Sequence, residues 1–113
     1  IMLKRIKKFF DREQNLLIHI IASICVLTLG IYFKVNTIEW FLLILVIMLV
    51  ISSELLNSAI ELAVDTYTLK YNALAKVAKD SAAGAVVTSA FFALVIGISI
   101  FLPKIIILIK SNF

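Results

Sequence analysis

Three long runs of apolar residues, separated by short polar stretches, take up most of this 113-residue chain. The runs cover residues 16–33, 39–64 and 81–102. A helix rises 1.5 Å per residue, so even the shortest run reaches about 27 Å, close to the roughly 30 Å hydrocarbon core of a bilayer. Hydrophobic residues make up 63% of the chain and charged residues 16%, which excludes a soluble domain of this length and a disordered chain. The sequence therefore predicts an all-α membrane protein with three transmembrane helices.

The polar segments beside the spans complete a single membrane domain. Residues 1–12 interleave basic and apolar positions, which is typical of a short amphipathic helix on the membrane surface or of an ordinary basic flank. Residues 65–80 are expected to form a loop. The third span is expected to end at Pro103, because a helix interior does not readily tolerate proline. Residues 103–113 are then a tail, whose apolar patch extends the third helix or lies at the interface.

The basic residues are distributed unequally between the two sides of the predicted spans. Eight of the eleven Lys and Arg residues lie in the N-terminal flank and in the 65–80 loop, and three lie on the opposite side. Because basic residues concentrate on the cytoplasmic side of spanning helices, we expect a cytoplasmic N-terminus and an outer C-terminus in the cell membrane. The net charge of +4 then reflects topology and anionic headgroups, and no nucleic-acid partner is expected.

Five polar residues share one face of the inner half of the second span. At 100° per residue, Glu54, Asn57, Ser58, Glu61 and Asp65 fall on a stripe roughly 100° wide. Charge inside a spanning helix is costly, so this stripe must line a cavity or meet a neighbouring helix. Stacked carboxylates repel one another unless a cation lies among them, and Mg²⁺ prefers carboxylate oxygen. The stripe therefore predicts a divalent-metal site.

Small side chains recur at every fourth position of the third span, from Ser81 to Gly97. Such ridges let helices approach closely in lipid, where packing drives association. Three helices can hardly enclose both this ridge and the polar stripe. We therefore expect a homo-oligomer with sites near the subunit contacts.

Two segments carry a family resemblance: ELLNSAIELAVD at residues 54–65 and KYNALAKVAKDSAAGAVV at residues 70–87. They resemble the signature of the small prokaryotic diacylglycerol kinase family, which includes the undecaprenol kinases of Gram-positive bacteria. That signature is E-x-x-N-[ST]-A-I-E-x-x-x-D, followed about thirteen residues later by K-D. The resemblance covers nearly the whole chain. It implies a homotrimer of three-span subunits that phosphorylates a lipid alcohol, either diacylglycerol or undecaprenol, with ATP and Mg²⁺.

The same resemblance implies a role for each residue that matches the signature. These roles are Glu54 as general base, Asn57 orienting the site, Lys79 gripping the phosphates, Glu13 and Glu61 holding Mg²⁺, and Asp65, Tyr71 and Asp80 in the nucleotide site. Phosphoryl transfer needs little beyond a metal, a cation, positioning and a base, so the absence of soluble-kinase motifs from the sequence does not argue against it.

Two other functions compete with a lipid kinase. A small transporter or ion pathway could also use intramembrane carboxylates, but residues 40–51 and 94–102 offer almost no polar lining toward the outer side. The second competing function is an inactive structural subunit. The sequence shows no sign of lost activity, because every acidic position of the signature is filled.

The histidine of the first span, His19, is expected to be a packing or interfacial residue. It lies about 240° around the helix from Glu13, so the two do not share a face. A histidine without a second nearby ligand is more often structural than metal-binding.

Overall fold

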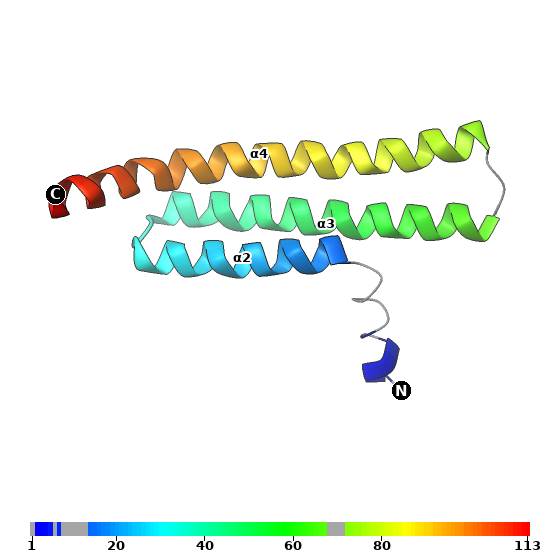
Figure 1. The fold of residues 1–113 in the computed structure, drawn as a ribbon, viewed down its shortest axis with the longest axis horizontal. Helices are drawn as coiled ribbons and strands as arrows, with labels where there is room; N and C mark the ends of the chain where they lie inside the picture. Colours follow the sequence, from blue (N-terminus) through cyan, green and yellow to red (C-terminus); the bar gives the residue numbers. More distant parts are fainter. Residues whose placement is uncertain (1, 6, 8–13, 68–71) are drawn as a thin grey trace.

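The computed structural model describes residues 2–5, 7, 14–67 and 72–113, and this part of the chain forms helices and no strands. The three long helices are α2 (Gln14–Tyr32), α3 (Thr37–Tyr67) and α4 (Ala73–Asn112). Each is long and apolar enough to cross a membrane. Figure 1 shows them running roughly alongside one another, with consecutive helices pointing in opposite directions. The predicted all-α membrane protein with three spanning helices is confirmed.

The turn between α2 and α3 is short and held by local contacts. Lys34 adopts a left-handed backbone with φ of 52°, and the backbone N–H of Val35 donates to the carbonyl of Gly30 at 3.2 Å. At the start of α3, the N–H of Glu39 donates to Asn36 Oδ1 at 2.8 Å, and the N–H of Asn36 donates to Glu39 Oε1 at 3.1 Å. This reciprocal pair satisfies donors that the first turn of a helix leaves free, so α3 begins at a defined residue.

The connection predicted for residues 65–80 is shorter than expected. α3 continues to Tyr67, and α4 begins at Ala73. Asn72 caps α4, because its side-chain oxygen accepts from the N–H groups of Leu74 and Ala75. Most of the residues expected to form a loop are therefore helical, and residues 68–71 lie outside the described part of the chain.

The third helix does not end at Pro103, because α4 continues through it to Asn112. Of the two alternatives for the apolar patch that follows the proline, extension of the third helix is therefore confirmed. Proline removes one backbone donor, which costs the helix a hydrogen bond to the carbonyl of Ser99. Spanning helices tolerate this loss when neighbouring groups support the backbone. Directly after the proline, Lys104 Nζ donates to the carbonyl of Ile100 at 3.3 Å and to Glu39 Oε2 on α3 at 2.8 Å. Lys104 thus holds α4 against the start of α3.

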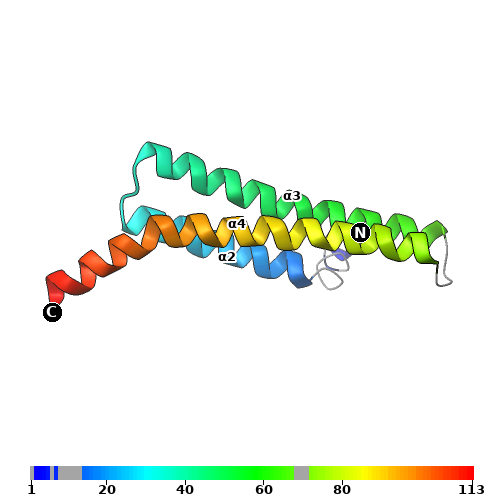
Figure 2. The same ribbon diagram turned by 90° about the horizontal axis from the view of Figure 1, so that it is seen from above.

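α3 is the helix that packs against both others, since its contacts join it to α2 and to α4. Figures 1 and 2 show α2 and α4 along its length, with the last turns of α4 extending past the α2–α3 turn. Near that turn lies a small apolar core, formed by Val35, Leu43, Ile100 and Phe101. Within the described residues, the backbones of α2 and α4 do not come close to each other. Side chains of the three helices therefore line the space between α2 and α4.

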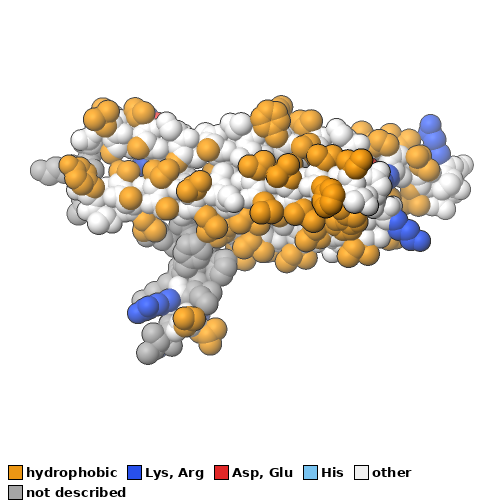
Figure 3. Space-filling model, turned by 180° about the vertical axis from the view of Figure 1, so that it is seen from behind, with side chains coloured by type: hydrophobic (Ala, Val, Ile, Leu, Met, Phe, Trp, Pro, Cys, Tyr) orange, Lys and Arg blue, Asp and Glu red, His pale blue; other side chains and the backbone are white. Residues whose placement is uncertain are grey.

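Large hydrophobic side chains cover the outside of the helices. Figure 3 shows them spread along one face, with Lys and Arg side chains mainly at one end of the helices and on the N-terminal segment. Examples are Phe41, Met48 and Leu56 on α3 and Phe91 on α4, each more than half exposed. Apolar surface of this extent is suited to lipid or to other subunits.

The amphipathic segment predicted for residues 1–12 lies largely outside the described residues. Residues 2–5 are helical, and both Met2 and Leu3 are exposed.

Candidate functional site

The polar stripe of α3 is turned away from the lipid-facing surface. Glu54 is 4% exposed and Ser58 is 3% exposed, although both lie in an apolar spanning helix. Asn57, Glu61 and Asp65 are half-buried. The prediction that this face lines a cavity or meets a neighbouring helix is confirmed.

The deepest carboxylate of the stripe is paired with a residue from another helix. His19 Nε2 on α2 lies 3.0 Å from Glu54 Oε1 on α3. The expectation that His19 is a packing or interfacial residue did not include this contact. It rested on the position of His19 relative to Glu13 on the same helix, whereas the partner is on the next one. The sequence held one signal for this contact: the two residues lie in those halves of adjacent antiparallel spans that face the same side.

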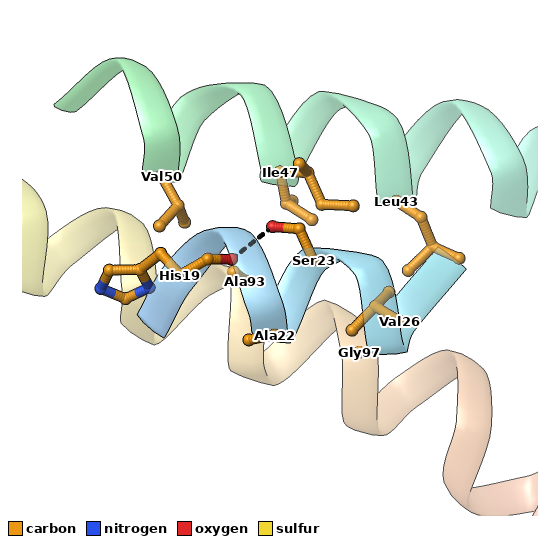
Figure 4. Close-up of a pocket in the computed structure, with 10 residues that line it drawn as sticks. His19, Ala22, Ser23, Val26, Leu43, Ile47, Val50, Ala93 and Gly97 are labelled. Carbon is orange, nitrogen blue, oxygen red and sulfur yellow. Dashed lines mark hydrogen bonds between the residues drawn. The ribbon is translucent and has the colours of Figure 1, made fainter. Parts of the chain in front are cut away.

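His19 also stands at one end of an apolar space between the helices. Figure 4 shows a pocket that side chains of α2, α3 and α4 line, among them His19, Ala22, Leu43 and Gly97. Ser23, in the same pocket, donates its hydroxyl proton to the carbonyl of His19 at 2.7 Å.

A longer groove with a volume of about 500 Å³ adjoins this pocket. Along α4 it extends from Ala90 to Ile105, and His19 is the polar residue of its lining. Ala93 and Gly97, two members of the predicted small-residue ridge, line both spaces. Within one subunit, these members of the ridge therefore open a groove instead of making a close helix contact.

The remaining stripe residues gather toward the C-terminal end of α3 and the N-terminal end of α4. Lys79 Nζ on α4 donates to Asp65 Oδ1 on α3 at 2.5 Å. One turn deeper on α3, Asn57 Nδ2 lies 3.4 Å from Glu61 Oε1. Asp80, by contrast, pairs with Lys76 of its own helix at 3.1 Å, and both side chains are exposed. The structure thus brings together two pairs of predicted site residues and leaves Asp80 at the surface.

Two buried oxygens of the stripe have no partner among the described residues: Asn57 Oδ1 and Ser58 Oγ. Buried polar atoms are almost always hydrogen-bonded, so an unpartnered pair beside a carboxylate indicates a place for a ligand or for another subunit. Oxygen donors of this kind are the ones that Mg²⁺ prefers. The Glu61 carboxylate therefore fits a magnesium ligand, and the Asn57 amide, whose Nδ2 lies 3.4 Å from Glu61 Oε1, can orient it.

Two residues of the predicted site, Glu13 and Tyr71, lie outside the described part of the chain. Within the described part, no group of three or more His, Cys, Asp and Glu side chains is placed to hold a metal ion. A site built on Glu61 therefore needs further oxygen ligands beyond those described, for example from Glu13 or from nucleotide phosphates.

The profile of the family described as "Prokaryotic diacylglycerol kinase" matches residues 3–101. The chain belongs to this family. It is 46% identical over 93 residues to an undecaprenol kinase of Bacillus subtilis (strain 168), an alignment that covers 82% of this chain and 76% of the relative. It is 38% identical over 97 residues to a diacylglycerol kinase of Synechocystis sp. (strain ATCC 27184 / PCC 6803 / Kazusa), covering 85% of this chain and 55% of that relative. No solved structure matches the chain significantly.

Membership of the prokaryotic diacylglycerol kinase family agrees with the resemblance found in the sequence. The profile match includes the whole polar stripe and the Lys79–Asp80 pair. This chain is therefore a lipid kinase of that family, and the polar face of α3 is its candidate active site.

Proposed function

We propose that this kinase transfers the γ-phosphoryl group of ATP to the hydroxyl of a polyprenol such as undecaprenol, in a reaction assisted by Mg²⁺. The observation that carries the proposal is the position of Glu54, a buried carboxylate whose partner His19 lines an apolar groove. Diacylglycerol is the alternative acceptor.

The lining of the groove favours a polyprenol. Its polar member is His19, and the neighbouring Ser23 hydroxyl already donates to a backbone carbonyl. A polyprenol carries a hydroxyl and an otherwise apolar chain, whereas diacylglycerol brings two ester groups that would lack donors here. The 46% identity to a protein named undecaprenol kinase supports the same choice.

An ion pathway fits this lining less well. Toward the outer side the groove is bounded by Phe101, Leu102 and Ile105, which offer an ion no polar group. A conducting path needs polar lining throughout.

The nucleotide would approach from the opposite, cytoplasmic end of the stripe. Glu61 would hold Mg²⁺ together with Glu13, and Asn57 would orient the Glu61 carboxylate. The bound ion would neutralise charge on the phosphates. Lys79, held by Asp65 in the described structure, supplies a cation within reach of the same region. Tyr71 and Asp80 complete the proposed nucleotide site.

Glu54 then acts where the lipid and the nucleotide are proposed to meet. It lies about 10 Å along α3 from Glu61, deeper in the membrane. Its carboxylate would accept the hydroxyl proton of the lipid while the alcohol oxygen attacks the γ-phosphorus and ADP leaves. A lipid arriving from the bilayer and a nucleotide arriving from the cytosol would thus meet on one helix face.

We further propose that the active unit is a homotrimer in the cell membrane, with a cytoplasmic N-terminus and an outer C-terminus. The unpartnered Ser58 hydroxyl and the exposed apolar surface of α3 support an assembly in which neighbouring subunits cover this helix. The mass of the complex in mild detergent tests the subunit number.

Glu61→Gln tests the proposed chemistry. In vesicles with radiolabelled ATP, we expect it to lower phosphoryl transfer to the lipid at least about 100-fold, because it removes the anionic ligand of Mg²⁺. Glu39→Gln, which changes a carboxylate at the opposite end of the same helix, is the matched control and should stay within about threefold. A Glu61→Gln rate within a few-fold of wild type would show that the stripe is not the active site.

A further inference from the structure

His19 and Glu54 form a buried polar contact between two helices inside the membrane. The side chain of Glu54 is 5% exposed and that of His19 is 28% exposed, at an Nε2–Oε1 distance of 3.0 Å. The histidine supplies the side-chain contact that the described residues give to this carboxylate. The roles proposed above use Glu54 but leave His19 without a function.

A carboxylate in this position needs support to act as a base. A carboxylate without a partner rotates between orientations, so its oxygens are poorly placed toward a reacting hydroxyl. A hydrogen bond to Oε1 prevents this rotation, because it fixes the carboxylate plane. The second oxygen, Oε2, to which no side chain of the described residues donates, is then available for the hydroxyl of the lipid.

We propose that His19 is a positioning residue for the lipid kinase reaction: it donates from Nε2 to Glu54 Oε1 and orients the carboxylate toward the groove. This inference rests on the proposed function, in which Glu54 is the general base. His19 acts through Glu54. Its loss should therefore slow the chemical step and leave substrate affinity nearly unchanged.

Substitution of His19 by leucine and by glutamine tests this role. His19→Leu removes the donor, and we expect kcat to fall about 30- to 100-fold while KM for ATP and for the lipid stays within about twofold. The side-chain amide of His19→Gln can donate to the same oxygen and should restore kcat to within about fivefold of wild type. Thr28→Val, an exposed position on the same helix whose hydroxyl bonds its own backbone, is the control. Equal rates for the Leu and Gln variants would overturn the proposal.

The imidazole can also be observed directly, because His19 is the single histidine of the chain. In protein labelled with ¹⁵N-histidine and purified without a polyhistidine tag, NMR should place a proton on Nε2. Glu54→Gln should shift that resonance. Identical imidazole signals in the wild type and the Glu54→Gln variant would contradict the proposal even if His19→Leu failed to fold.

The two measurements separate this inference from the function on which it rests. If Glu54→Gln abolishes transfer while His19→Leu leaves kcat unchanged, the kinase chemistry stands and the positioning role is wrong. If Glu54→Gln shifts the imidazole signal but keeps full activity, the base assignment fails and the positioning role fails with it.

Discussion

Lys79 and Lys76 lie about one turn apart on α4 but make different contacts. Lys79 reaches across to Asp65 on α3, whereas Lys76 pairs with Asp80 on its own helix, where both side chains are exposed. Lys79→Met should therefore lower phosphoryl transfer at least about 100-fold, since it removes the cation closest to the proposed phosphate site. Lys76→Met breaks a surface pair worth a few tenths of a kcal/mol and should stay within about threefold. Steady-state rates with radiolabelled ATP distinguish the two, and equal effects would place the phosphates elsewhere.

The sequence predicted the stripe correctly because helical periodicity is a local property. The angular positions of Glu54, Asn57 and Glu61 follow from residue spacing, and their burial follows from the cost of charge in lipid. The His19–Glu54 contact escaped prediction because it depends on how α2 is rotated and shifted against α3. Periodicity within one helix holds no information about that register. The family roles of Glu13 and Tyr71 stay predictions, since both residues lie outside the described structure.

At the scale of the helices, the close approach of α2 and α3 depends on Gly30. A Cβ added to Gly30 would lie 2.8 Å from the ring of Trp40, whereas one added to Gly84 on α4 meets nothing within 4 Å. Gly30→Ala should therefore destabilise the fold by about 1–3 kcal/mol through overpacking, seen as a lower Tm in detergent. Gly84→Ala should leave Tm unchanged or raise it slightly, because alanine favours helix. A Gly30→Ala variant as stable as the Gly84→Ala control would show that the turn is loosely packed.

The helices themselves were predicted well in number and less well in length. Long apolar runs identify spans reliably, because length and composition suffice. The end expected at Pro103 was wrong because the proline costs the helix one hydrogen bond, and contacts of neighbouring groups such as Lys104 support the backbone there. The capping residue Asn72 lies inside the segment expected to be a loop, and its role became visible only once the start of α4 was defined.

At the scale of the whole molecule, the described subunit leaves both a groove and a broad apolar surface uncovered. The groove runs beside α4 and adjoins the pocket that holds His19, and its lining is apolar apart from this residue. A membrane enzyme can use such a groove to hold a hydrophobic substrate while the cytoplasmic ends of its helices bind a water-soluble one. The sequence did not predict this groove. Small residues in a spanning helix indicate close helix packing, but Ala93 and Gly97 of the third span line a space between the helices instead.

The most direct test is the transfer of ³²P from ATP to undecaprenol and to diacylglycerol, offered side by side in vesicles to the wild type and to Glu54→Gln. We predict Mg²⁺-dependent labelling of undecaprenol at least about tenfold faster than labelling of diacylglycerol, and a loss of about 100-fold or more in the variant. Faster labelling of diacylglycerol would contradict the proposed substrate. Labelling of either lipid that survives Glu54→Gln at nearly the wild-type rate would contradict the proposal that the buried carboxylate of α3 is the base.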